Sequence, residues 1–318
     1  MALIGAFVLQ LLQMLLVLTL APGLVGLVRK VKARLLRRRG PAILQPYRDF
    51  ARLLRKETVL ADNASWLFRV APYLIFAAIW VAAALTPTFA TGLLFSWSGD
   101  IIAIIALLGS ARFFLALAGM DIGTSFGGLG SSREMMIASL AEPAMLMIVF
   151  SLALIAGSTA LSTMAEYMAS PEVGLRVSLG LALIALVIVA LAENARIPVD
   201  NPATHLELTM VHEAMVLEYS GRHLALIELA AALKLLLYIS LIGCLFLPVG
   251  LASANAGVAA LLWGLVAYFV KLGIGGALLG LFEVSIAKMR VFRVPQFLGA
   301  ALILGLLATL LRFVSASF

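Results

Sequence analysis

The sequence predicts an all-α integral membrane protein with about eight transmembrane helices, amphipathic helices in its cytoplasmic loops and both termini on the extracytoplasmic side. Of the 318 residues, 63% are hydrophobic and 12% are charged, and the mean hydropathy is +1.10. A soluble domain is closer to half apolar and a quarter charged. The apolar residues form long runs rather than the alternating pattern of an outer-membrane barrel. These observations exclude a soluble enzyme and a disordered chain, and they argue against a barrel.

The whole chain, residues 1–318, is expected to form one polytopic membrane domain. About 20 apolar residues suffice to cross a bilayer. The first apolar run is too long for a signal peptide and lacks a basic start, so it is expected to be a retained helix. The predicted spans are Leu3–Val28, Val70–Phe95, Ile101–Met120, Ser132–Leu161, Leu175–Ala195, Leu224–Leu251, Val258–Phe282 and Pro295–Phe313.

The basic residues lie mostly on one side of these spans. Eleven of the 23 Lys and Arg residues fall between Arg29 and Lys56, whereas the opposite side has only Arg176 and Arg312. The positive-inside rule therefore makes the loops at about 29–66, 121–131, 194–223 and 284–294 cytoplasmic. The formal net charge of +7 is explained by membrane topology and does not indicate nucleic-acid binding.

The first cytoplasmic loop contains a predicted amphipathic helix. Gly40-Pro41 should turn the chain. From Tyr47 to Lys56, Phe50, Leu53 and Leu54 share one face and basic residues occupy the others. This pattern is typical of an interfacial helix on anionic lipid, and it also suits a docking surface for a cytoplasmic partner.

The second cytoplasmic loop, Phe126–Glu134, is rich in glycine. No Gly-Lys-Ser/Thr follows, so a phosphate-binding loop is disfavoured. Ser131 and Glu134 have the spacing of a capping box, with Ser131 as N-cap of the following helix. The glycines would form a flexible turn or allow a partner to approach closely.

The third cytoplasmic loop, Glu193–His223, mixes acidic residues, arginines and all three histidines of the chain. Pro198 and Pro202 should end the fifth span and hold the chain extended. A helix is then expected from about Thr204 to Tyr219, with Gly221 near its C-cap.

Within that helix, Glu207 and Glu218 would share one face, and His205 and His212 another. A run of this kind is usually a solvated hairpin, but the interleaved apolar residues suggest that it is half buried.

Several ionisable residues lie inside the predicted spans or at their ends. Charges at bilayer depth are costly unless they are paired or hydrated, so each is a functional candidate or a side chain that reaches the interface. Carboxylates and lysines of this kind could form a proton relay. They are Arg112, Glu142, Glu193, Glu228, Lys234, Lys271 and Glu283. A single cysteine and three unpatterned histidines give no sign of a redox cofactor in this chain.

Short motifs along almost the whole chain resemble those of the subunit 1 (H-type) membrane protein of respiratory complex I and its hydrogenase relatives. They are RRGPAILQPYRDFARLLRKE in the first loop, Arg112, SSRE at Ser131–Glu134, AEP at Ala141–Pro143, LAENARIPVDNP at Leu191–Pro202 and EYSG at Glu218–Gly221. Quinone-reducing members typically show a Pro-Phe-Asp-Leu-Pro-Glu-Ala-Glu-like run after the arginine. This chain has IPVDNPATHLELTMVHEAMVLEYSG instead, and looks like the membrane-anchor subunits of formate hydrogenlyase and other energy-converting [NiFe] hydrogenases.

This resemblance implies a non-catalytic, multi-pass subunit of an oxidoreductase complex in a prokaryotic cytoplasmic membrane. The chain itself would bind no cofactor. The [NiFe] centre and iron–sulfur clusters would lie in partner subunits, namely hydrogenase large and small subunits and iron–sulfur subunits. Antiporter-like membrane subunits would complete the path for H⁺ or Na⁺, and membrane lipid would surround the chain.

The resemblance also implies roles for particular residues. Ion-translocation candidates are Glu142, Glu193, Glu207, Glu213, Glu218 and Glu228, to which Lys234, Lys271 and Glu283 are added from their apolar surroundings. Arg196, Asp200, His205 and His212 would belong to a coupling loop. Partner docking is implied for Arg37, Arg38, Arg39, Tyr47, Arg48, Asp49, Arg133 and Glu134.

Three other functions are open. A quinone-binding subunit of a complex I-like NADH or ferredoxin:quinone oxidoreductase predicts a quinone-sized cavity between the first, fifth and sixth spans and the cytoplasmic loops. A stand-alone secondary transporter is disfavoured because no inverted repeat or matched pair of broken helices is evident. A passive anchor would have no ion role. The electron donor (formate, CO or ferredoxin) and the ion stay open as well.

Overall fold

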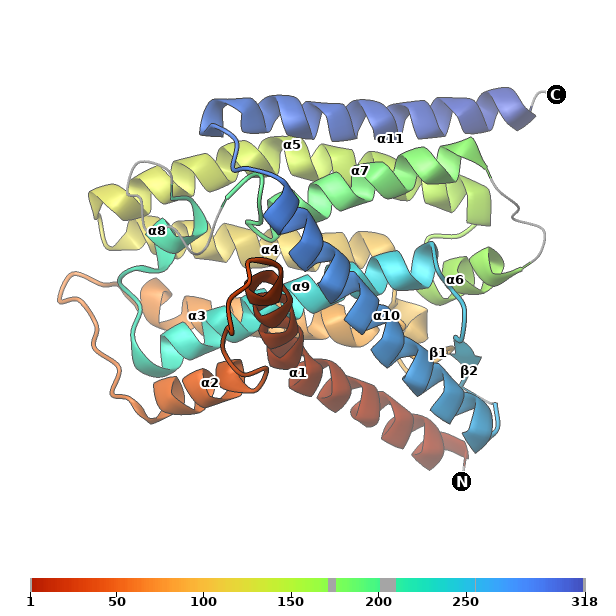
Figure 1. The fold of residues 1–318 in the computed structure, drawn as a ribbon, viewed down its shortest axis with the longest axis horizontal. Coiled ribbons are helices and arrows are strands. Elements are labelled where there is room, and N and C mark those ends of the chain that lie inside the picture. Colours follow the sequence, from red (N-terminus) through yellow and green to blue (C-terminus); the bar gives the residue numbers. More distant parts are fainter. Residues whose placement is uncertain (1, 171–175, 201–209, 255, 317–318) are drawn as a thin grey trace.

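The computed structural model, which describes residues 2–170, 176–200, 210–254 and 256–316, confirms an all-α membrane fold (Figure 1). Within these described ranges, seven helices are long and apolar enough to cross a membrane. The eighth predicted span corresponds to a shorter helix of 17 residues, α7. The eight predicted spans map onto α1 (Ala2–Leu35), α3 (Trp66–Leu85), α4 (Ile101–Asp121), α5 (Ser125–Ala156), α7 (Val177–Glu193), α9 (Gly221–Leu245), α10 (Val258–Ser285) and α11 (Val294–Ala316). That all eight segments cross the bilayer stays a prediction.

Shorter elements connect these helices at the two ends of the molecule. They are α2 (Gln45–Arg55), α6 (Leu161–Ala169), α8 (His212–Val216), two 3-10 turns at Ser96–Ser98 and Val291–Arg293, and the parallel strands β1 (Ala90–Thr91) and β2 (Ala252–Ser253). The β1–β2 pair joins the chain after α3 to the chain after α9. The predicted amphipathic helix of the first loop is therefore present as α2.

The predicted glycine-rich turn before the fourth span is helical instead. Thr124 is the N-cap of α5, and its hydroxyl accepts a hydrogen bond from the Gly127 N–H at 3.2 Å. A Cβ on Gly127 would lie 2.0 Å from the carbonyl oxygen of Gly119, so the glycine lets α5 begin directly against α4. Ser131 is consequently inside the helix, and its hydroxyl donates to the Ala116 carbonyl at 2.9 Å. The predicted capping box was wrong because close helix packing replaced the loop.

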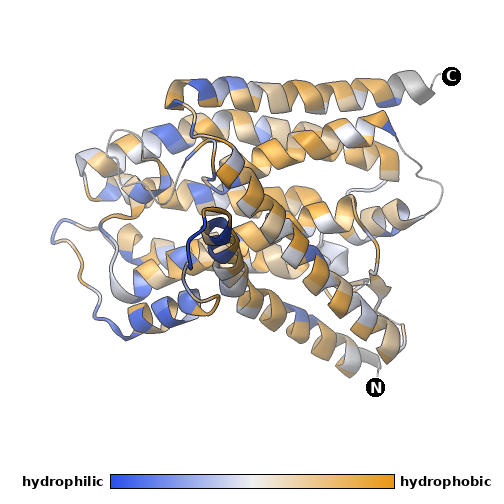
Figure 2. Cartoon of the chain, viewed as in Figure 1, coloured by the Kyte–Doolittle hydropathy of each residue, from blue (hydrophilic) through white to orange (hydrophobic). Residues whose placement is uncertain are grey.

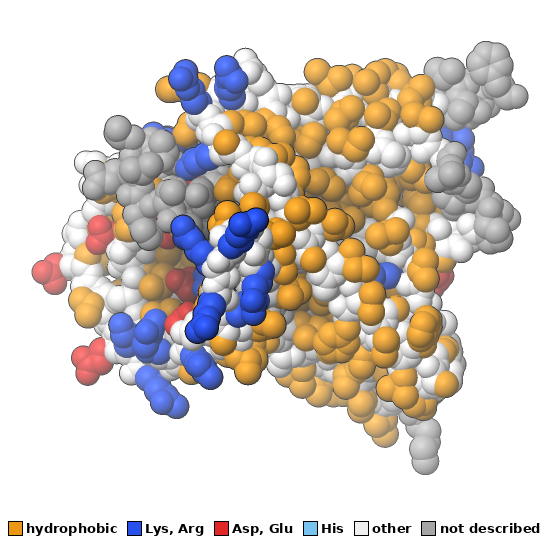
Figure 3. Space-filling view, in the orientation of Figure 1, with side chains coloured by type: hydrophobic (Ala, Val, Ile, Leu, Met, Phe, Trp, Pro, Cys, Tyr) orange, Lys and Arg blue, Asp and Glu red, His pale blue; other side chains and the backbone are white. Residues whose placement is uncertain are grey.

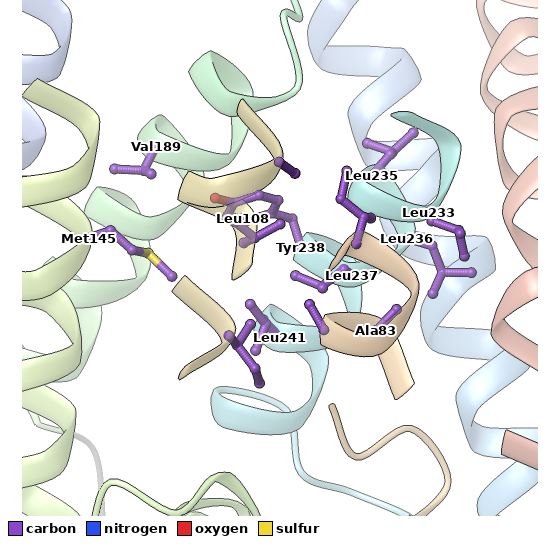
Figure 4. Close-up of a cluster of buried hydrophobic side chains, with 14 of the residues drawn as sticks. Ala83, Leu108, Met145, Val189, Leu233, Leu235, Leu236, Leu237, Tyr238 and Leu241 are labelled. Carbon is purple, nitrogen blue, oxygen red and sulfur yellow. The ribbon is translucent and has the colours of Figure 1, made fainter. Parts of the chain in front are cut away.

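Helix α9 forms the centre of the molecule. Figure 4 shows its apolar side chains next to those of α3, α4, α5 and α7. Because lipid tails are as apolar as leucine, this packing is held by dispersion and shape rather than by exclusion of water. The labelled residues are Leu233, Leu235, Leu236, Leu237, Tyr238 and Leu241 of α9 with Ala83, Leu108, Met145 and Val189.

The outer faces of the bundle differ sharply between its two ends. Apolar side chains cover most of the visible surface, whereas Lys and Arg gather at one end (Figures 2 and 3). That end carries α2 and α8, and both chain termini lie at the opposite end (Figure 1). The arrangement fits the one-sided distribution of the basic loops. Which side of the membrane the termini occupy stays a prediction.

Candidate functional site

The most distinctive polar feature within the helix bundle is a group of five ionisable residues that we call the Arg112 cluster. The Arg112 side chain of α4 is only 4% exposed. Its Nε lies 3.3 Å from Glu134 Oε1, its Nη1 lies 3.5 Å from Glu142 Oε1, and its Nη2 contacts Glu193 Oε1. Lys234 Nζ lies 3.8 Å from the other oxygen of Glu193. The cluster joins α4, α5, α7 and α9.

The charges of the Arg112 cluster do not cancel. With every group ionised, Glu134, Glu142 and Glu193 face only two cations, so one negative charge is in excess. An uncompensated charge at this depth is strongly unfavourable. Binding of one proton or one monovalent cation would neutralise the cluster, which is the property that a coupling site needs.

The three carboxylates differ in exposure. The side chains of Glu134 and Glu193 are 10% and 5% exposed, whereas that of Glu142 is 47% exposed. Glu142 lies near the middle of α5, which is long enough to cross the bilayer. A half-exposed carboxylate at that position requires water or a neighbouring polar group to cover it.

A cavity of about 380 Å³ connects the Arg112 cluster to the charged end of the molecule. It lies between α1, α2, α8, α9 and the chain that follows α7, and Glu193 and Lys234 of the Arg112 cluster are among its lining residues. The other titratable lining residues are Arg29, Asp49, Arg52, Arg196, Asp200, His212, Glu213 and Glu228. This is the position predicted for a quinone cavity, but ligand pockets are mostly apolar with few polar groups. The mixed charge suits water and ions better.

The chain after α7 is held by ion pairs. Arg196 Nη1 and Lys32 Nζ lie 3.4 and 2.5 Å from the two oxygens of Glu283, at the end of α10. Lys288 Nζ lies 2.7 Å from Asp200 Oδ1. Burial lowers the pKa of Arg196, an effect that Glu283 opposes and Arg29 reinforces. Arg196 and Asp200 of the predicted coupling loop therefore connect the chain after α7 to the end of α10 and to the segment that follows α10.

The segment after α7 is not extended, although Pro198 and Pro202 predicted an extended chain. Helix α7 already ends at Glu193, and Ala195 has a left-handed φ of 47°. The N–H groups of Val199 and Asp200 then donate to the Arg196 carbonyl at 2.8 and 3.2 Å. A compact turn results because these backbone bonds satisfy groups that an extended chain would leave buried and unpaired.

The helix predicted for Thr204–Tyr219 is much shorter in the part that the structure describes. Only His212–Val216 is helical there, as α8. Gly221 begins α9 with φ of 54° rather than capping a preceding helix. Glu207 and His205 lie outside the described residues, and the faces predicted for them stay predictions.

The remaining ion-translocation candidates lie in three settings. Glu213 and Glu228 line the large cavity. Glu218 is exposed at the charged end. Lys271, on α10, donates to the Gly243 carbonyl in the last turn of α9 at 3.4 Å, away from the Arg112 cluster.

The docking candidates divide into exposed and internal residues. Arg37, Arg38, Arg39 and Arg48 are exposed. Asp49 pairs with Arg52 at 3.1 Å and lines the cavity. Tyr47 donates its hydroxyl to the Thr19 carbonyl at 2.5 Å, and burial raises its pKa.

Arg133 donates to the Met210 carbonyl at 2.8 Å, and Glu134 points inward to Arg112. The side chain of Glu134 therefore does not face the surface that would receive a partner.

Two features have structural roles that were not predicted from the sequence. Arg112 was recognised as an arginine in an apolar span but received no site role, although it is the centre of the cluster. The EYSG motif holds the loop after α2. Tyr219 stacks on Phe68 with ring centroids 3.9 Å apart, and Ser220 exchanges two hydrogen bonds with the Val59 backbone at 2.8 and 2.9 Å. A lone arginine among apolar residues was the available signal for the first feature.

Comparisons with known proteins show the family and the fold of this chain. A family model described as NADH dehydrogenase matches residues 8–314. The chain is 34% identical to formate hydrogenlyase subunit 4 of Escherichia coli over 90% of this chain and 92% of that protein. It is 36% identical to hydrogenase-4 component C of the same organism over 87% of each chain. A chain from the membrane-bound sulfane sulfur reductase, an archaeal respiratory membrane complex, has the same fold, with a TM-score of 0.79, 20% identity and coverage of 96% and 99%.

Proposed function

The chain belongs to the NADH dehydrogenase family, and from that premise we propose that it docks a peripheral [NiFe]-hydrogenase module and couples electron transfer there to movement of H⁺ or Na⁺. It is a multi-pass subunit of the cytoplasmic membrane, of the kind found in hydrogenase and complex I-like respiratory complexes. The docking and coupling roles are the proposal.

The observation that carries the proposal is the continuity between the large cavity and the Arg112 cluster. Glu193 lines the cavity, and it also contacts Arg112. Arg112 in turn reaches Glu142 at 3.5 Å. Ionisable side chains thus lead from the charged end of the molecule to the middle of α5. Chains of acidic and basic groups inside a membrane protein commonly mark ion paths.

Coupling would act through the charge balance of this path. A redox change in a docked module alters the potential at the charged end, where Arg196 and Asp200 are tied to Glu283 and Lys288. A shift of that turn moves the end of α7, which carries Glu193. The Glu193 carboxylate would then move closer to either Arg112 or Lys234. A proton or cation would enter or leave the cluster to restore its neutrality.

The expected partners follow from the two ends of the path. The exposed arginines at positions 37–39 and the α2 surface suit the hydrogenase large and small subunits and other iron–sulfur subunits. The [NiFe] centre and the clusters would lie in those partners. The half-exposed Glu142 suits an antiporter-like membrane subunit, which would cover the carboxylate and continue the path.

Replacement of Glu193 and Glu142 by Gln tests the proposal in the intact complex. Each variant keeps the shape of the side chain but cannot exchange a proton. Hydrogen evolution from reduced methyl viologen is measured together with ion movement in inverted membrane vesicles. We expect continued hydrogen evolution with strongly reduced ion movement.

Glu218→Gln is the matched control, because this acidic residue is exposed and lies outside the path. If both path variants translocate ions at the wild-type ratio to hydrogen, the coupling role is wrong and the chain is a passive anchor.

A quinone-binding role is the second candidate, and the position of the large cavity is the observation that favours it. Reduction of decylubiquinone by the purified complex, with inhibition by a quinone-site ligand, would support it. Loss of that inhibition in a variant with Phe50→Trp, which narrows the cavity next to α2, would assign the ligand to this cavity.

A further inference from the structure

A second, smaller cavity lies beside the Arg112 cluster. Its volume is about 30 Å³, and its walls include Arg112, Glu134, His212 and Lys234. A buried site needs roughly 10–15 Å³ to hold one water molecule. The smaller cavity is therefore polar enough and large enough for about two.

The two cavities share part of their walls. Four residues line both of them: His212 of α8 and Ile227, Ala231 and Lys234 of α9. Ile227 and Ala231 cannot bind a proton, and Lys234 is engaged with Glu193 at 3.8 Å. His212 is consequently the shared residue with a ring that can accept a proton on one nitrogen and release it from the other.

We propose that His212 transfers protons between the large cavity and the Arg112 cluster. This inference rests on the proposed coupling function and names the residue by which a proton enters the cluster. It also selects H⁺ rather than Na⁺ as the ion, because an imidazole can relay a proton but cannot pass a sodium ion through its ring.

The step balances as a simple proton transfer. A proton from water in the large cavity binds the neutral imidazole of His212 and gives the imidazolium ion. The imidazolium N–H then breaks as an O–H bond forms on Glu134, by way of water in the smaller cavity. Glu134 becomes a neutral carboxylic acid, His212 returns to neutral imidazole, and no electrons change hands.

The charges around His212 suit this exchange. Burial lowers the pKa of His212, and the positive charge of Lys234 lowers it further. The carboxylates of Glu134, Glu213 and Asp200 raise it. These groups come from α5, from α8 and from the turn after α7, so the ring senses both cavities. The ring therefore lies among groups that favour its neutral form and groups that favour its protonated form, as a residue that accepts and releases a proton requires.

Protonation of Glu134 would change the electrostatic interactions of the whole cluster. A neutral Glu134 attracts Arg112 less strongly, so the Arg112 guanidinium interacts more strongly with Glu193 and Glu142. The proton that enters at His212 thereby favours release of a proton at Glu142, at the far end of the path.

The test uses His212→Gln and His212→Ala in the intact complex. Proton uptake by inverted vesicles is measured in sodium-free buffer during hydrogen evolution from reduced methyl viologen. We expect proton uptake per hydrogen to fall by about tenfold or more. Added imidazole, which the large cavity can admit, should restore uptake in His212→Ala, and its effect should rise with the fraction of imidazole that is neutral.

His223→Gln is the matched control. His223 is buried against Tyr73 and Tyr219 and lines neither cavity. If His212→Gln keeps the wild-type proton uptake per hydrogen and Glu193→Gln loses it, the role of His212 is wrong but the coupling function stands. Wild-type coupling in both would overturn the coupling function itself. Loss in His212→Ala that imidazole fails to restore would show a structural role for the side chain and would also overturn the proposal.

Discussion

Two charged regions of this protein use the same residue types in opposite ways. In the Arg112 cluster, every described charge is within 4 Å of an opposite charge, and three of the five side chains are at most 10% exposed. In the basic elbow, which we define as the end of α1 from Arg34, the turn through Arg39 and α2, most charges are exposed. The difference shows that depth in the membrane, rather than charge itself, decides whether a charged side chain must be paired.

The energetics of the two regions differ for the same reason. Removing one partner of a buried ion pair costs about 3–5 kcal/mol, because the other charge is left without compensation. An exposed pair contributes about 0–1 kcal/mol. Substitutions in the cluster should therefore change both stability and function, whereas those in the elbow should act chiefly on partner binding.

Arg112→Met should have the largest effect. The substitution leaves Glu134, Glu142 and Glu193 facing Lys234 alone, so we expect a loss of about 3–5 kcal/mol in unfolding free energy. Thermal unfolding of the detergent-solubilised protein measures the change. Arg48→Met in the exposed elbow is the control. A stable Arg112→Met protein would mean that the carboxylates are already neutral.

Gly26→Ala should have the next largest effect, on the attachment of the elbow to the membrane bundle. A Cβ on Gly26 would lie 2.0 Å from the Ile43 carbonyl oxygen, so the chain before α2 must shift. Overpacking of this kind costs about 1–3 kcal/mol. Faster trypsin cleavage after Arg48 and Arg52 would report the displaced helix. Gly5→Ala, where a Cβ meets nothing within 4 Å, should leave the cleavage rate unchanged.

The effect of pH through His212 should be smaller than the effects of the two substitutions above. His212 lines the large cavity, whose walls include residues of both regions. Because the pKa of His212 is lowered by folding, its contribution to stability is complete above the unfolded pKa of about 6.5 and is lost as the pH falls. We expect the unfolding free energy of the wild-type protein to fall more than that of His212→Gln between pH 7 and pH 5. Thermal unfolding at several pH values measures this. Equal losses in the two proteins would show that His212 titrates normally.

Replacement of Arg37, Arg38 and Arg39 by Gln should have the smallest effect on stability, within about 0.5 kcal/mol. These exposed side chains lie in the elbow, so their loss should weaken retention of the peripheral subunits, most clearly as salt is raised. Co-purification at increasing ionic strength measures it. Asp62→Asn, which removes an exposed acid from the same loop, should not weaken retention.

Much of the fold was predictable because the local amino-acid composition determines which segments can span a membrane. Each predicted span corresponds to a helix, and the amphipathic pattern after Gly40-Pro41 corresponds to α2. The elements that were predicted wrongly lie where tertiary packing overrides local preference. The glycines near Gly127 were predicted to form a loop, but Gly127 lets α5 pack against α4 and Gly130 lets it pack against α8.

The candidate site was predictable in its members but not in its grouping. Glu142, Glu193 and Lys234 stood out as charges within or at the ends of apolar segments, yet nothing in their spacing placed them around Arg112. Glu134 was assigned to partner docking from the family resemblance, and its spacing from Ser131 predicted a capping residue at a helix start. Its inward direction became evident only from its contact with Arg112 of α4.

The sequence by itself determined the class of protein, the positions of its apolar helices and the end at which its basic residues gather. These properties depend on the free energy of moving short segments from water into lipid, which is a local quantity. Only the tertiary structure decided that five ionisable residues from four helices meet at one point and that two cavities share His212. Those relations depend on helix directions and rotations, which are set by packing between segments far apart in the chain.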